Sequence, residues 1–203
     1  MRRRHLPLLA LPLLARTAEA MPADLRFRIM REGSAIGTHR VGFTEAGGLL
    51  TARTDVAIQV KVMSFTVFRL SHVFTEVWSG NRLVSATSRH DRNGTVKEMA
   101  VRAEGGALLV TGTAQGSGAP QRLPAEAAPL SWWDPRRFAG PLFDNETGRP
   151  LQLQWSRAAL PNGGTRWRAS GETEGEASYA ADGTWLDWKT KGDDGSIVTY
   201  ERF

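Results

Sequence analysis

Residues 55–78, DVAIQVKVMSFTVFRLSHVFTEVW, contain the clearest strand pattern in the chain. Apolar and polar side chains alternate in the first part, and the apolar face consists of Val56, Ile58, Val60 and Val62. A period of two residues is typical of a β-strand with one buried face. From Phe65 to Trp78 both faces are apolar. That pattern predicts a strand that is covered on both sides or passes from one surface to another.

The same kind of pattern extends outward from this stretch over most of the chain. We expect further strands at residues 25–29, 36–43, 83–88, 96–103, 108–113, 151–156, 165–170, 175–180, 184–190 and 197–203. Glycine or asparagine stands at nearly every corner between them, as in Asn93-Gly94. Short strands at this spacing predict an all-β fold, a single antiparallel curved sheet that forms an open or closed barrel. Because no linker divides the chain, we expect one β-barrel-like domain over residues 21–203.

The strand pattern is interrupted at residues 115–150, which are rich in glycine, proline and alanine. The centre of this region is SWWDPRRF, residues 131–138. Pro135 can open a short helix, because the first helical turn tolerates a missing N–H. We therefore expect one short helical excursion around residues 131–147, lying across the sheet.

The first twenty residues have the layout of a secretory signal peptide. A basic start, MRRR, precedes the apolar run LPLLALPLLA at residues 6–15, and Ala18-Glu-Ala20 offers small residues at a cleavage site. The apolar run is much shorter than the roughly 20 residues that span a bilayer. The sequence predicts export of the mature chain by the Sec or the twin-arginine route, and no transmembrane segment within it.

Composition narrows the classes of function. Lys and Arg number 26 against 21 Asp and Glu, but four of the arginines and only one of the acids lie in the predicted leader. The mature chain therefore has no basic cluster of the kind that a nucleic-acid partner requires. The chain has no cysteine, which excludes disulfides, Cys-ligated zinc and thiol catalysis. Export without cysteine favours a bacterial periplasm. Phosphate loops and dinucleotide fingerprints are absent, so we expect no cofactor.

Histidines and one glutamate are the candidate chemical groups. His72, Glu76 and Trp78 share one face of the predicted strand, where a His and a carboxylate can perform acid–base chemistry. A buried hydrogen-bonded pair or the polar lining of a cavity is the more common role. His39, His72 and His90 lie on three strands and could bind zinc, but their spacing does not require it. We therefore expect no metal, and interpret residues 89–92, which include His90, as a solvated hairpin end.

Trp132 and Trp133 cannot both point the same way in extended chain. We interpret them as part of a lid that closes the core, with an aromatic gate for a ligand as the alternative. Arg136 and Arg137 beside them could meet an anionic headgroup, although a solvated turn is the more common outcome.

Several short motifs spread over the mature chain occur together in one family. They are Phe27-x-Ile29, Gly33-x-x-Ile36-Gly37-x-His39, Glu76-x-Trp78 with Gly80-x-x-Leu83, Asn93-Gly94, Ser131-x-Trp133, Gly148, Tyr179, Gly183, Ile197 and Tyr200. In this combination the chain resembles a proteobacterial exported family, domain of unknown function six-one-three-four. It is also distantly similar to envelope half-barrel and lipocalin-like carriers. The resemblance implies export and a β-rich domain, and assigns no catalytic residue.

The function that we expect first is non-enzymatic: an exported periplasmic protein that binds an apolar or amphipathic, lipid-like molecule inside the curved sheet. The candidate lining residues are Phe68, Leu70, His72, Phe74, Glu76, Trp78, Trp132 and Trp133. The alternative is an envelope assembly or interaction protein with a filled core and a protein partner. A hydrolase that uses His72 and Glu76 is the third hypothesis.

Overall fold

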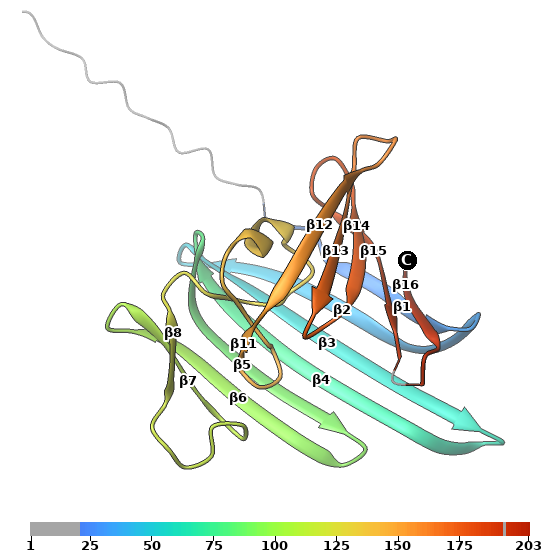
Figure 1. Cartoon of the computed structure of the whole chain (residues 1–203), viewed down its shortest axis with the longest axis horizontal. Coiled ribbons are helices and arrows are strands. Elements are labelled where there is room, and N and C mark those ends of the chain that lie inside the picture. Colours follow the sequence, from blue (N-terminus) through green and yellow to red (C-terminus); the bar gives the residue numbers. More distant parts are fainter. Residues whose placement is uncertain (1–20, 193) are drawn as a thin grey trace, which may run out of the picture.

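The computed structural model describes residues 21–192 and 194–203, so the predicted signal peptide at residues 1–20 lies outside the described residues. One large sheet dominates this part of the chain (Figure 1). Its strands are β1 (Leu25–Arg31), β2 (Ser34–Ala46), β3 (Leu49–Val62), β4 (Phe65–Ser79), β5 (Arg82–Arg92), β6 (Thr95–Glu104), β7 (Ala107–Gly112), β8 (Gln121–Pro124), β12 (Leu153–Ala159), β13 (Thr165–Gly171), β14 (Gly175–Tyr179), β15 (Trp185–Lys191) and β16 (Ile197–Arg202).

The sheet is antiparallel and open. Its order is β12-β13-β14-β15-β16-β1-β2-β3-β4-β5-β6-β7-β8, so that β12 and β8 form the two edges. The first and last strands of the chain pair in the middle of the sheet, with Phe27 opposite Arg202. The sheet curves so that β12–β15 stand over one end of the long strands β2–β6 (Figure 1). The predicted all-β fold with one antiparallel curved sheet is confirmed, in its open, half-barrel form.

A close approach between β2 and β3 depends on a glycine. A Cβ atom at Gly37 would lie only 2.1 Å from the carbonyl oxygen of Ala57 on β3. A side chain there would force the strands apart, since real Cβ atoms do not come so near to backbone oxygen. The register of β1 against β2 shifts between Ile29 and Met30, beside the same glycine. Gly37 therefore marks a point of tight packing between the two strands.

A single segment, residues 125–152, covers part of the concave face of the sheet, and we call it the crossing segment. It contains β9 (Ala128–Pro129), the 3₁₀ helix η1 (Pro135–Ala139), β10 (Leu142–Phe143) and β11 (Pro150–Leu151). β10 pairs with both β9 and β11, which gives the segment its own small sheet. In Figure 1 it is the olive and yellow stretch between the two halves of the large sheet.

The helical part of this segment is shorter than predicted. η1 opens at Pro135, with the Asp134 side chain accepting a hydrogen bond from the Arg136 backbone N–H, but it ends at Ala139. Gly140 and Pro141 follow, and neither continues a helix. The chain then extends and pairs as β10. The helical excursion expected around residues 131–147 is thus one 3₁₀ turn, and the preceding region includes a short edge strand, β8, that was not predicted.

The core lies between the concave face and the crossing segment. The sheet contributes Phe27, Val41, Phe74, Trp78, Leu108, Tyr179 and Trp185, all almost fully buried. The crossing segment contributes Trp133, Phe138 and Phe143 from above. Phe43 on β2 meets Trp133 at a ring distance of 5.1 Å, and Phe138 stacks on Trp155 of β12 at 4.2 Å. The segment therefore ties the two halves of the sheet together.

Candidate functional site

The inner face of β4 carries every candidate lining residue that the sequence places on this strand. Burial alternates along the strand, so that the even-numbered side chains point to the concave face. Their order is Phe68, Leu70, His72, Phe74, Glu76 and Trp78, which we call the β4 row. Its exposure is unequal, because Phe68 and Leu70 are half-buried whereas the side chains from His72 to Trp78 are buried. The row thus has an open end and a sealed end.

Glu76 is the polar centre of the sealed end. It is fully buried, and three donors reach its carboxylate. The indole N–H of Trp78 donates to Oε2 at 2.9 Å, while Ser131 Oγ and the indole N–H of Trp133 donate to Oε1 at 2.5 and 3.1 Å. Ser131 and Trp133 belong to the crossing segment. The carboxylate therefore fastens that segment to β4.

Opposing effects act on the protonation of Glu76. Burial, the largest of them, raises the pKa of the Glu76 carboxyl, because a low-dielectric interior disfavours its charge. The hydrogen bonds from Ser131, Trp133 and Trp78 act in the other direction, as does the positive charge of Arg137. Since both oxygens already accept hydrogen bonds and the group is shielded from solvent, the carboxylate is suited to hold structure rather than to attack a substrate.

Arg137 completes the sealed end. Its guanidinium carbon lies 3.3 Å from the centre of the Trp78 ring and 5.3 Å from that of Trp133. The same guanidinium forms an ion pair with the buried Asp134 at 3.0 Å. A cation over a tryptophan face is favoured by the ring quadrupole. Arg137 is therefore buried, and only Arg136 has the exposed position that the sequence predicts for both arginines. The burial of Arg137 depends on Trp78, which stands far away in the sequence.

The two adjacent tryptophans point to opposite halves of the molecule. Trp133 faces β2 and β4, while Trp132 lies among Trp155, Trp188 and Phe138, at ring distances of 5.5–5.9 Å. The phenol of Tyr179 donates to the backbone carbonyl of Trp132 at 2.7 Å. Both rings pack against the core. This arrangement agrees with the interpretation of the two residues as part of a lid that closes the core.

Three histidines on neighbouring strands form a row across the sheet. This row crosses β4 between the sealed end and the open end of the β4 row. The register places Phe27 opposite His39, His39 opposite Val56, Val56 opposite His72 and His72 opposite His90. His72 shares a hydrogen bond of 2.9 Å with Ser88, and His90 Nε2 lies 3.3 Å from a carboxylate oxygen of Glu146. His90 is buried, so the expectation that residues 89–92 form a solvated end is wrong for this residue. The inward alternation of β5 continues as far as His90, and Arg92 beyond it is exposed.

The histidine row is neutral at neutral pH. Burial lowers the pKa of His39 to about 3 and that of His72 to about 4, and each value is lowered further by a neighbouring histidine. Burial also lowers the pKa of His90. The ring nitrogens of His39 are enclosed by Phe27, Trp185 and Tyr200, and the described chain offers them no hydrogen-bond partner. In residues 21–192 and 194–203, no group of three or more His, Cys, Asp or Glu side chains is placed to hold a metal ion.

Beyond the histidine row, the open end of the β4 row borders a groove of about 440 Å³. Phe68 and Leu70 form one wall with Ile58 and Val60 of β3, their cross-strand partners. The remaining lining residues are Arg31, Ile36, Arg92, Trp188, Thr190, Gly192, Asp194, Ser196, Val198 and Tyr200. Most of the side chains on β2–β4 and on β15–β16 that face the groove are apolar or aromatic.

Charged groups stand at the margin of this groove. Arg31 forms an ion pair with Asp194 across the β1–β16 side. The guanidinium of Arg92, at the end of β5, lies 5.2 Å from the centre of the Phe68 ring. The groove therefore combines an apolar wall with a charged rim. Sequence patterning identified Phe68 and Leu70, but the opposite wall comes from β15 and β16, whose nearness to β4 cannot be found in any local pattern.

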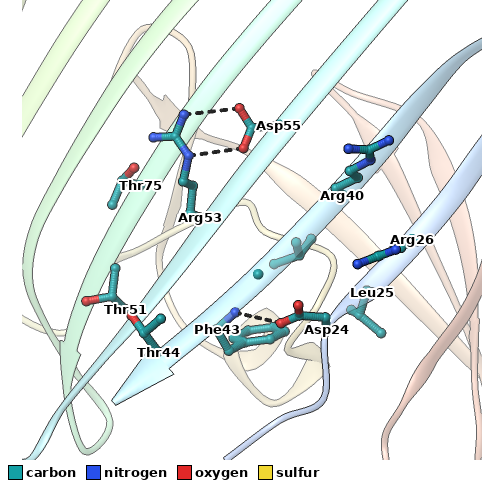
Figure 2. A pocket seen from close by; sticks show the side chains of 12 residues that line it. Asp24, Leu25, Arg26, Arg40, Phe43, Thr44, Thr51, Arg53, Asp55 and Thr75 are labelled. Carbon is teal, nitrogen blue, oxygen red and sulfur yellow. Dashed lines mark hydrogen bonds and ion pairs between the residues drawn. The ribbon is translucent and has the colours of Figure 1, made fainter. Parts of the chain in front are cut away.

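A second hollow of similar size, about 450 Å³, lies on the convex face of the sheet (Figure 2). Arginines and threonines dominate its surface, and Arg53 forms a bidentate pair with Asp55 on the same strand at 3.1 and 3.2 Å. Asp24 accepts a hydrogen bond from the Phe43 backbone N–H at 3.1 Å. This polar hollow contains none of the predicted lining residues.

Of the eight candidate lining residues, the structure brings Phe68 and Leu70 to an open groove. His72, Phe74, Glu76 and Trp78 are buried beneath the crossing segment. Trp133 is a buried residue of that segment, and Trp132 packs among aromatic rings on the other side. His72 and Glu76 share the inner face, but no substrate can reach Glu76 there. No helix in the described chain has the length and apolar character to cross a bilayer.

One solved structure supports this architecture. A β-barrel-like protein of domain of unknown function DUF1849 from Brucella abortus superposes with a TM-score of 0.59 at 9% identity, over 89% of this chain and 94% of that one. A DUF1089 family protein from Pseudomonas aeruginosa gives a TM-score of 0.44 at 10% identity, over 89% and 95% of the two chains. No curated protein matches the chain. The model of one sequence family matches residues 27–202, so the chain belongs to the family described as Domain of unknown function (DUF6134).

Proposed function

We propose that this protein binds an apolar or amphipathic, lipid-like molecule in the groove at the open end of the β4 row. The observation that carries the proposal is the unequal covering of one apolar face. The crossing segment fills the concave side over Phe74 and Trp78 but leaves Phe68 and Leu70 facing a groove. Apolar side chains left half-exposed on a concave surface are typical of a binding site.

The size and chemistry of the groove suit an amphipathic ligand. A volume of 440 Å³ falls within the range of about 300–1,000 Å³ that small-molecule sites occupy. The wall formed by Ile58, Val60, Phe68 and Leu70 can cover a hydrocarbon chain. Arg92 at the rim places positive charge where a carboxylate or phosphate head would lie, while the charge of Arg31 is balanced by Asp194.

The histidine row marks the inner limit of the ligand. Below it, the side chains of Phe74, Glu76 and Trp78 are packed against the crossing segment. A ligand is therefore expected to lie between the histidine row and the free end of the β3–β4 hairpin. The proposed setting is the periplasm, on the basis of the leader-like sequence at residues 1–20, where lipids and their breakdown products are the abundant amphiphiles.

The test is a direct binding titration with residues 21–203. The probe is dansyl-undecanoic acid, whose fluorescence rises on transfer from water to an apolar site, and palmitate serves as the competitor. We expect saturable binding that palmitate reverses. Leu70→Asp should weaken binding by about tenfold or more, because a carboxylate in an apolar wall opposes both the chain and its anionic head.

A matched leucine provides the control. Leu49 is also partly exposed, but it stands at the opposite end of β3, outside the groove. Leu49→Asp should leave probe affinity unchanged. If the wild-type protein gives no saturable signal, or if both variants weaken binding equally, the groove is not a lipid-like site.

The alternative with a protein partner draws on the same structure. The sealed end is a filled core, as that hypothesis expects. If the folded protein does not bind dansyl-undecanoic acid, the interaction with a protein partner becomes the favoured function. The hydrolase hypothesis would require Glu76 to reach a substrate, and its complete burial opposes this.

A further inference from the structure

The β3–β4 hairpin extends beyond the strands on either side of it. The pairing of β2 with β3 stops at Gly37 opposite Ile58, and the pairing of β4 with β5 starts at Leu70 opposite Arg92. Residues 59–69 therefore form a two-stranded ribbon with the turn at Met63 and Ser64, both of which have positive φ. Four residues of β3 past the last β2 pair correspond to roughly 13 Å. Figure 1 shows this hairpin (cyan and teal) reaching past the neighbouring β5–β6 hairpin.

The end of this ribbon is apolar and exposed. Val62 is 53% exposed, Met63 89%, Phe65 77% and Val67 56%. Projecting ribbons in soluble proteins are normally protected by charged or turn-forming side chains, because exposed apolar strand ends favour association. We call these four residues the apolar tip.

The apolar tip is continuous with the wall of the groove. The register pairs Ile58 with Leu70 and Val60 with Phe68, and these pairs line the groove. After a register shift between Val60 and Lys61, Val62 pairs with Phe65 at the turn. An apolar stripe therefore runs from the groove to the end of the ribbon without an intervening acidic residue.

The charged side chains of the ribbon itself have one sign. Between residues 56 and 75 the only charged side chains in the sequence are Lys61 and Arg69. Both are exposed and lie on the ribbon beside the apolar tip. Basic residues next to exposed Val, Met and Phe form the combination that favours an anionic lipid surface.

From these observations we infer that the apolar tip inserts into the surface of a lipid bilayer and that Lys61 and Arg69 contact its anionic headgroups. The ribbon is long enough for its end to enter the roughly 5–10 Å of the interfacial region. Two narrow strands offer much less than the roughly 800 Å² per partner that a stable protein interface buries, so a bilayer is the better occupant. A second step, transfer of a lipid along the stripe into the groove, rests on the proposed function.

Vesicle flotation tests the inference with residues 21–203. Wild-type protein should float with vesicles of phosphatidylethanolamine and phosphatidylglycerol, and less with vesicles of phosphatidylcholine alone. The double variant Met63→Ser/Phe65→Ser should bind the anionic vesicles at least about tenfold more weakly than the wild type. Its control is Leu49→Ser/Phe203→Ser, which removes two other exposed apolar side chains and should bind like the wild type. Unchanged melting temperatures will show that both variants fold.

The outcomes separate this inference from the proposed function. If the wild type does not float, or if the tip variant floats equally well, the tip is not a membrane contact. A concentration-dependent dimer that the tip variant abolishes, without vesicle binding, would assign the tip to a second copy of the chain and also overturn the inference. If the protein binds vesicles but not dansyl-undecanoic acid, the tip is a membrane contact and the groove is not a lipid-like site.

Discussion

The two ends of the β4 row differ in what covers them, although they belong to the same face of the same strand. At the sealed end, Glu76 and Trp78 are hydrogen-bonded and stacked beneath the crossing segment. At the open end, Phe68 and Leu70 have apolar neighbours on β3 but no cover of comparable depth. A strand pattern specifies which side chains share a face, whereas the covering segment decides which of them become core and which become a site.

The largest loss of stability is expected when the carboxylate of Glu76 is removed from the sealed end. Glu76→Ala leaves two indole N–H groups and the Ser131 hydroxyl buried without their acceptor, and leaves the charge of Arg137 less balanced. We expect the free energy of unfolding to fall by about 4 kcal/mol in urea denaturation. Leu70→Ala, at the half-buried open end, should lower it by only about 1 kcal/mol. Equal losses at both positions would contradict the distinction between the ends.

The histidine row between the two ends predicts a pH dependence. The folded pKa of His72, about 4, lies below its unfolded value of 6.5, so the unfolded chain binds the proton first as the pH falls. This contribution is intact above the unfolded value, and it decreases by about 1.4 kcal/mol per pH unit down to the folded pKa. Burial raises the folded pKa of Glu76, so the contribution of Glu76 to the free energy of unfolding changes in the opposite direction as the pH falls.

Comparison with a variant isolates the histidine. His72→Gln keeps a hydrogen-bonding group toward Ser88 and removes the titration. From about pH 7 to about pH 4.5, the wild type should lose about 2–3 kcal/mol more stability than this variant. Parallel stability curves, measured by urea denaturation at each pH, would show that His72 is not held neutral by burial.

The aromatic packing on the other side of the crossing segment can be tested at Gly175. A Cβ atom there would lie 2.9 Å from both Trp132 Cζ2 and Trp188 Nε1. Gly175→Ala should therefore displace the rings and lower the free energy of unfolding by about 2 kcal/mol, with a changed near-ultraviolet circular dichroism spectrum. Gly42→Ala is the matched control, because the nearest atom, Asp24 Oδ1, is 3.9 Å away. A loss as large at Gly42 would point to a general cost of alanine in these strands.

Sequence patterning predicts the strands and the β4 row well, because alternation is a local property that survives in the fold. It also places Pro135 correctly at the opening of a helix. The sealing of Glu76 could not be predicted in the same way, since its partners Ser131 and Trp133 stand more than fifty residues later in a region without periodicity. The burial of His90 was missed for a similar reason: Glu146, which lies beside its ring, also belongs to the crossing segment.

The smallest stability effect is expected at the end of the open half. Phe65 is 77% exposed, so its replacement by serine removes little buried surface and should change the free energy of unfolding by no more than about 0.5 kcal/mol. Phe74, nine residues along the same strand, is 1% exposed, and Phe74→Ser should cost about 4 kcal/mol. Urea denaturation of the two variants compares one side-chain type at both ends of β4. If Phe65→Ser lowers the free energy of unfolding by more than about 1 kcal/mol, the tip packs against the rest of the protein. If the loss is smaller, the apolar side chain of Phe65 is not needed for folding, and a contact with another molecule is the better explanation for it.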